Sequence, residues 1–155
     1  MLYEAASSDT HLKHHSLSAI FEQQENGDFL MNDRQLFGAF LKEKRNARLV
    51  TVRAIAKMVD VGCGYYSDIE SGRRCRIEIG FLDKIIKVLS ISDNDSKTLY
   101  DLAGKAKKAA PPDLTDYINN TPKVRFALRV AKETATDEDW DYFTRYLELK
   151  EQPDD

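Results

Sequence analysis

The chain has 155 residues, of which 42% are hydrophobic and 32% charged, and its formal net charge is −3. This balance predicts a globular protein. The sequence has no apolar run of about 18 residues and no recognisable secretory leader, so neither a membrane span nor an export signal is expected. Two cysteines are too few for a zinc framework and favour a reduced, cytoplasmic chain.

The N-terminal residues 1–31 are predicted to be an extension outside the core, either disordered or with one short helix over 16–25. This segment contains His11, His14 and His15, whose spacing could hold a metal ion. A polar and mobile segment is a poor metal site, so neither a metal nor another cofactor is expected.

Helical periodicity begins at residue 32, and no stretch alternates long enough to form a strand. Asn32 and Gln35 have the spacing of a capping box, which predicts a helix over 33–45. Thr51 is the predicted N-cap of a second helix, and a tight connection at 60–62 leads to a third helix over 63–70, which Gly72 ends. Two further helices follow, near 79–89 and from Ser92 or Asp93. The predicted core of the five helices is Leu36, Phe37, Phe40, Leu41, Val52, Ile55, Ala56, Val59, Tyr66, Ile69, Ile79, Leu82, Ile85, Ile86, Leu89, Leu99, Leu102, Ala103 and Ala106.

The pair Pro111-Pro112 interrupts the helical pattern, because proline lacks a backbone donor and its ring blocks a continuing helix. It separates a predicted domain over 32–110 from a helical C-terminal region over 111–155. Three short helices are expected in this region: near 112–119, from a cap at Thr121 followed by proline, and after Thr136. The last helix presents one apolar stripe, which is predicted to pack in a core or to form a dimer or partner contact: Trp140, Phe143 and Leu147.

Two short helices joined by about three residues, then a glycine and a basic loop, are typical of a helix-turn-helix. Residues 51–74, TVRAIAKMVDVGCGYYSDIESGRR, resemble the XRE family of phage-repressor and Cro-like regulators. Ile55-Ala56 takes the place of the usual Leu-Ala pair, Tyr65-Tyr66-Ser67 lies in the recognition helix, and Ile69-Glu70-x-Gly72 closes it. The resemblance extends over about residues 34–106.

This resemblance implies an all-α protein with a five-helix, lambda-repressor-like domain and a small helical C-terminal region. It implies a sequence-specific transcriptional regulator, most often a repressor, that binds double-stranded DNA as a homodimer in the bacterial or phage-like cytoplasm. It also implies an ion pair between Arg45 and Glu70, which would hold the recognition helix against the first helix. The alternative is an exposed, solvated Arg45.

The chain departs from the family at the positions that normally read bases. Aspartate replaces the usual turn glycine at residue 60. Gly62, Cys63 and Gly64 replace the Ser or Thr and the polar side chains that usually begin the recognition helix, so direct readout depends on few groups. The arginines after the third helix suit phosphates or a narrow minor groove, so backbone and shape are expected to contribute more than base edges. The predicted DNA-binding residues are Thr51, Arg53, Cys63, Gly64, Tyr65, Ser67, Asp68, Arg73, Arg74 and Arg76.

Charge is distributed unevenly along the chain. Residues 33–110 hold 16 Lys and Arg against 10 Asp and Glu, a net charge of +6, whereas residues 1–32 carry −4 and residues 111–155 carry −5. A basic middle between acidic ends is the pattern expected of an electrostatic DNA footprint. Its alternative is a chance clustering of solvated side chains.

Two other functions compete with DNA binding. An antitoxin or immunity-type regulator would bind a protein partner, such as a toxin or a regulatory peptidase, through the C-terminal helices, and the acidic tail and sparse base readers favour it. An enzyme using the histidines is not expected, because no spacing pairs a nucleophile with a base. Cys63 could sense oxidants at its helix start, or be an inert thiol.

Overall fold

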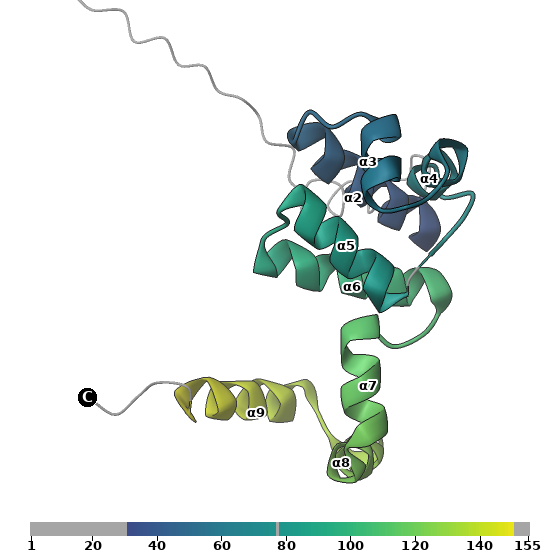
Figure 1. Ribbon diagram of the computed structural model, residues 1–155. Coiled ribbons are helices and arrows are strands. Elements are labelled where there is room, and N and C mark those ends of the chain that lie inside the picture. Colours follow the sequence, from purple (N-terminus) through teal and green to yellow (C-terminus); the bar gives the residue numbers. More distant parts are fainter. Residues whose placement is uncertain (1–30, 77, 151–155) are drawn as a thin grey trace, which may run out of the picture. The chain divides into compact units, whose positions relative to one another are not determined.

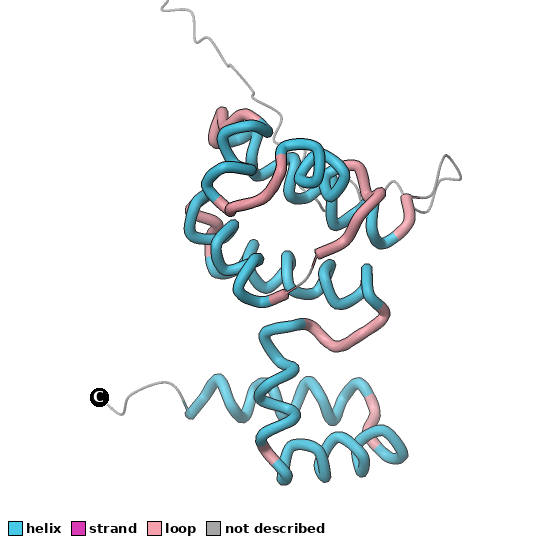
Figure 2. The backbone as a smooth tube through the Cα atoms, turned by 45° about the vertical axis from the view of Figure 1, so that its right-hand side comes forward, coloured by secondary structure: helices cyan, strands magenta, loops and turns pink. Residues whose placement is uncertain are grey.

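The computed structural model describes residues 31–76 and 78–150. Within these residues the chain forms eight helices and no strand, which confirms the predicted all-α class (Figures 1 and 2). No helix in this part is long and apolar enough to cross a membrane. The histidines of the predicted extension lie outside the described residues. The helices divide into two compact units, one ending at Cys75 and the other beginning at Arg76.

The first unit contains α2 (Asp33–Ala47), α3 (Val52–Met58) and α4 (Cys63–Glu70). The predicted capping box starts α2: Gln35 N donates to Asn32 Oδ1 at 3.1 Å, and Asn32 N donates to Gln35 Oε1 at 2.9 Å. Thr51 caps α3 as expected, because its Oγ1 accepts from Ala54 N at 3.1 Å. The buried apolar residues of this unit match the prediction except for Val52, which is half-buried: Leu36, Phe37, Phe40, Leu41, Ile55, Ala56, Val59, Tyr66 and Ile69.

The connection between α3 and α4 caps the C-terminal end of α3 with two backbone hydrogen bonds. Asp60 adopts the left-handed region with a φ of 58°. Its N–H donates to Lys57 O at 3.3 Å, while Val61 N donates to Ala56 O at 2.9 Å. These two bonds form the Schellman arrangement, which usually has glycine at the left-handed position. Aspartate tolerates this conformation better than most residues, so the turn forms without the glycine.

The second unit contains α5 (Ile79–Leu89), α6 (Asp93–Lys107), α7 (Pro112–Asn120), α8 (Pro122–Thr134) and α9 (Asp137–Lys150). The predicted boundary at Pro111-Pro112 lies inside it, between α6 and α7. Tyr100 of α6 donates its hydroxyl to Asp83 of α5 at 2.6 Å. Among the described residues of this unit, only α5 and α6 contribute buried side chains. Contrary to prediction, Ile79 is exposed and Ile86 is half-buried. The buried residues are Phe81, Leu82, Ile85, Leu89, Leu99, Leu102, Ala103, Gly104 and Ala106.

The last three helices have well-formed ends but no buried residue. Arg125 closes α7 by donating to the carbonyl oxygens of Ile118 and Asn119. Thr121 is the N-cap of α8 and Pro122 follows in its first turn, as predicted, but the Thr121 side chain makes no cap hydrogen bond. At α9, Thr136 and Asp139 bond reciprocally, as in a capping box. Its apolar stripe joins no core among the described residues, because every residue of α9 is exposed there: Trp140 by 43%, Phe143 by 49% and Leu147 by 44%.

Candidate nucleic-acid interface

Helix α4 is fixed to α2 by two close backbone approaches at its C-terminal end. At Gly38, a Cβ atom would lie 2.5 Å from the carbonyl oxygen of Glu70 and would also meet the carbonyl of Ile69. At Gly72, just past α4, the φ is 74° and a Cβ atom would lie 2.9 Å from backbone atoms of Gln35. Glycine is required at both positions because a Cβ atom would clash, and at Gly72 also because its φ is positive.

A buried ion pair adds a third connection at the same end of α4. Arg45 donates from Nε to Glu70 Oε1 at 2.6 Å and from Nη2 to Glu70 Oε2 at 2.9 Å, and both side chains are less than 10% exposed. A further bond runs from Arg45 Nη1 to Val50 O at 2.8 Å. The hydrogen bond that Arg45 donates to Glu70 raises the pKa of Arg45 above its usual value. The structure therefore contains the predicted pair, which joins α2, α4 and the segment before α3.

Tyr66 is the largest side chain buried in the first unit, and its hydroxyl group has no hydrogen-bond partner among the described residues. Burial, together with the negative charge of Glu70, raises the pKa of this hydroxyl well above its usual value. Tyr66 is therefore neutral and acts as a packing residue. It cannot contact a nucleic acid without leaving the core.

The N-terminal end of α4 is open in contrast. Gly62 occupies the N-cap and supplies no side-chain cap, and a Cβ atom at Gly62 or Gly64 would meet nothing within 4 Å in the described structure. Backbone N–H groups at the start of a helix attract anions when no side chain satisfies them. This helix start is therefore accessible to a phosphate or to the edge of a base.

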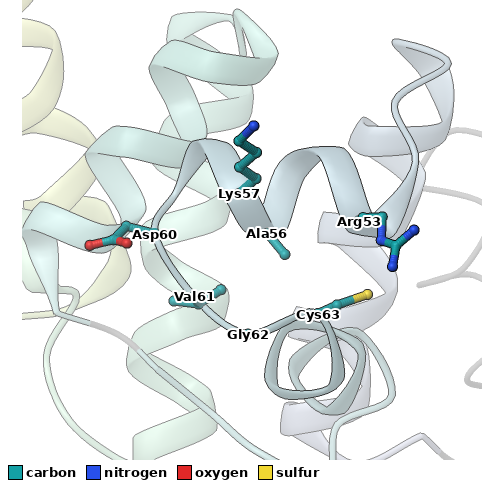
Figure 3. A pocket seen from close by; sticks show the side chains of 7 residues that line it. All are labelled: Arg53, Ala56, Lys57, Asp60, Val61, Gly62 and Cys63. Carbon is teal, nitrogen blue, oxygen red and sulfur yellow. The ribbon is translucent and has the colours of Figure 1, made fainter.

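A surface depression of about 490 Å³ lies between α3 and this start of α4 (Figure 3). In Figure 3 the sulfur of Cys63 and the guanidinium of Arg53 lie at one end of the depression, and Asp60 lies at the other. Lys57 projects from α3 and is exposed. Sequence reasoning selected Arg53 and Cys63 but missed Lys57, which the spacing of four from Arg53 places on the same face of α3.

The remaining predicted contacts form one cluster around Asp68. Its Oδ1 accepts from Arg73 Nε at 2.9 Å, and its Oδ2 lies 3.4 Å from Arg74 Nε. The guanidinium of Arg74 also lies over the ring of Tyr65, 5.4 Å from its centroid. The hydrogen bond from Arg73 lowers the pKa of Asp68. The sequence predicted a base contact for Asp68 and phosphate contacts for the arginines. In the structure the carboxylate of Asp68 instead pairs with Arg73 and Arg74 and offsets part of their positive charge.

Arg76 has different surroundings from Arg73 and Arg74. It belongs to the second unit, where its Nε donates to Glu78 Oε2 at 3.0 Å and its guanidinium lies 4.8 Å from the centroid of the Phe81 ring. Of the other predicted DNA-binding residues, Thr51 uses its side chain to cap α3, and Ser67 is exposed on α4. To contact DNA, Arg76 would therefore have to break its hydrogen bond to Glu78 and its contact with the Phe81 ring, which costs free energy.

The described residues contain no group of three or more His, Cys, Asp and Glu side chains that could hold a metal ion. Comparison with models of known protein families found no match, and comparison with curated proteins found no relative of this chain.

Proposed function

We propose that this protein is a sequence-specific, double-stranded-DNA-binding transcriptional regulator, most simply a repressor that acts as a homodimer in the bacterial or phage-like cytoplasm. In this proposal α3 and α4 are a helix-turn-helix similar to that of the XRE family, within a lambda-repressor-like domain, and α4 is the recognition helix. The single observation that carries it is the asymmetry of α4. Its C-terminal end is fixed by Gly38, Gly72 and the Arg45–Glu70 pair, while its N-terminal end is open beside basic residues.

The exposed side chains suggest how the surface would bind DNA. Arg53 and Lys57 on α3, and Arg73 and Arg74 after α4, would flank the recognition helix with basic side chains suited to phosphates. Arg73 and Arg74 share Asp68 as a counter-charge and would exchange it for phosphates on binding. Base reading would be limited to Ser67, Asp68 and the backbone near Gly64, because Tyr66 is buried. Sequence preference would then depend largely on DNA shape and deformability.

A salt titration tests this function. The best duplex selected from a random pool and a scrambled duplex are each titrated with the wild-type chain and with Arg73→Ala and Arg74→Ala. Each variant should bind both duplexes more weakly and reduce the slope of log affinity against log salt by about 0.9, the value for one lost phosphate contact. Arg145→Ala, which removes the same charge from α9, is the control and should leave the slope unchanged.

Asp68→Asn provides the complementary test. It keeps the shape of the side chain but removes the charge that pairs with Arg73 and Arg74, so affinity for the scrambled duplex should rise. Preference for the selected duplex should fall if Asp68 accepts a hydrogen bond from a base. If the arginine variants bind both duplexes like the wild type, the surface around α4 is not a DNA interface.

Binding a protein partner through the C-terminal helices is the second candidate function. The observation in its favour is that α7, α8 and α9 contain no buried residue although each carries large apolar side chains. A toxin or regulatory peptidase encoded beside this chain would be the partner in an antitoxin or immunity-type system. A stable complex with that partner, together with no DNA binding in the titration above, would favour this function.

A further inference from the structure

Helix α9 is amphipathic, but no described residue of this chain covers its apolar half. Every one of its 14 residues is exposed. At 100° per residue, its large apolar side chains fall on one half of the helix and most of its charges on the other. These apolar side chains are Trp140, Tyr142, Phe143, Tyr146, Leu147 and Leu149.

A helix of this length needs a packing partner. Isolated helices shorter than about 12–15 residues are marginal in water, and tertiary packing of the apolar face supplies most of their stability in proteins. The neighbouring α8 also leaves Phe126, Leu128 and Val130 exposed. Apolar surface gathered in this way on two consecutive helices marks an interface.

The charges of α8 and α9 are complementary. Helix α8 has one acidic residue, Glu133, and four basic residues, so its net charge is +3: Lys123, Arg125, Arg129 and Lys132. Within Asp137–Lys150 there are five acids and two bases, so α9 carries −3. Two helices that each have an uncovered apolar face and opposite charge are suited to pack on each other.

We propose that the partner is a second copy of this chain, with α8 of each copy packed against α9 of the other. A twofold axis relates the two α8–α9 contacts, so each copy uses the same surface in the interface. A lipid surface fits less well, because a helix lying on a membrane carries Lys and Arg on its polar face, whereas α9 is acidic.

The exposed surface has the size that a stable dimer needs. Five aromatic side chains of α8 and α9 are 43–74% exposed: Phe126, Trp140, Tyr142, Phe143 and Tyr146. An aromatic side chain can bury about 150–250 Å², so at these exposures the five offer roughly 400–700 Å² per copy. A stable interface takes about 800 Å² from each partner, which the exposed leucines and valines would complete.

This inference identifies the contact surface of the homodimer in the proposed function. Its tests use no DNA, so its failure and the failure of DNA binding can be distinguished.

Trp140 is the only tryptophan in the chain and reports directly on the proposed contact. Analytical ultracentrifugation and Trp140 emission are measured over the same dilution series of the full chain. We expect a dimer with blue-shifted emission that becomes red-shifted on dilution, with one midpoint for mass and emission. A monomer at every concentration overturns the proposal, and its emission then says whether α9 packs on its own chain (blue-shifted) or stays uncovered (red-shifted).

Leu147→Gln and its control Arg145→Gln place the same residue on the apolar and polar faces of α9. Both positions are exposed within one chain, so neither substitution should alter the fold of the monomer, which circular dichroism checks. Leu147→Gln should weaken dimerisation at least tenfold, whereas Arg145→Gln should leave it within about twofold. Equal dimerisation of both variants overturns the involvement of the apolar face.

A charge exchange tests the pairing of α8 with α9. One variant carries Arg129→Glu and Lys132→Glu on α8, and the other carries Asp141→Lys and Glu148→Lys on α9. Each variant alone should dimerise severalfold more weakly than the wild type, because the two helices at each contact then carry net charges of the same sign. An equal mixture should form heterodimers, in which both contacts are again between opposite charges. If the mixture dimerises no better than the separate variants, α8 does not pair with α9 of the partner.

Discussion

Gly38 and Gly64 are two helical glycines whose replacement by alanine should have opposite effects on stability. Gly38→Ala would push its Cβ into the carbonyl groups of Ile69 and Glu70, which cannot move as a flexible side chain can. We expect a loss of about 1–3 kcal/mol in the free energy of unfolding, the usual cost of overpacking. Gly64→Ala meets no described atom within 4 Å and should raise this free energy by up to about 0.5–1 kcal/mol.

Urea denaturation of both variants under the same conditions measures the difference. Equal stability of Gly38→Ala and the wild type would mean that α2 and the end of α4 are further apart than the structure places them.

The hydroxyl of Tyr66 provides a second test at a single residue. It is buried without a hydrogen-bond partner in the described part of the chain. Leaving a buried polar group unsatisfied costs about 1–3 kcal/mol, so Tyr66→Phe should stabilise the protein by about 1 kcal/mol while keeping the ring in the core. The midpoint of denaturation measures this gain, and a clear loss would mean that the hydroxyl has a partner in solution.

The cluster around Asp68 illustrates what the sequence could not predict about the site. Arg73 and Arg74 follow Asp68 by five and six residues, so helical spacing does not place them together. They meet because the chain turns back at Gly72 and Arg74 N donates to Asp68 O at 3.0 Å. The sequence shows that these residues are charged, but only the path of the loop shows that Asp68 forms ion pairs with the two arginines.

At the scale of the elements, helix starts were largely predictable because they depend on residues close in sequence. The Asn32–Gln35 capping box and the Thr51 cap involve neighbours three residues apart, and both are present. Thr121 also occupies the predicted N-cap of α8, with proline in the first turn, although its side chain makes no cap hydrogen bond. The approach of α2 to α4 at Gly38 could not be predicted, because it depends on the crossing of two helices and leaves no local pattern.

The Arg45–Glu70 pair should be essential to the position of α4. Glu70→Gln leaves a buried guanidinium without its counter-charge, and breaking a buried pair in this way costs about 3–5 kcal/mol. Thermal and urea unfolding of this variant measure the loss. Replacing both partners, with Arg45→Met and Glu70→Leu, should recover much of it because no unpaired charge is then buried. A single variant as stable as the wild type would mean that the pair is exposed in solution.

At the scale of the whole molecule, composition and periodicity predicted the all-α class, and the charge distribution identified the basic middle of the chain. They did not predict that the last three helices would lack a core. The spacing of Trp140, Phe143 and Leu147 is the same for a stripe buried within a chain and for one buried between chains. Only the exposure of the whole helix distinguishes these cases.

Deletion of residues 136–155 tests this distinction. Because every residue of α9 is exposed, its removal should not change the melting temperature of the protein at concentrations where the wild type is monomeric. At higher concentrations the wild type should melt at a higher temperature and the shortened chain should not, because only the dimer gains stability by mass action. A lower melting temperature at all concentrations would show that α9 packs on its own chain.

The unequal support of the two ends of α4 has a consequence for amide hydrogen exchange. The first turn can fray without breaking the Gly38 approach or the Arg45–Glu70 pair, because both lie at the other end of the helix. Protection should therefore increase along the eight residues, with fast local exchange near Gly64 and exchange near Glu70 only when the unit opens. This first turn can thus reshape on a faster timescale than the unit unfolds. If the proposed DNA binding is correct, a bound duplex should slow exchange most at this end.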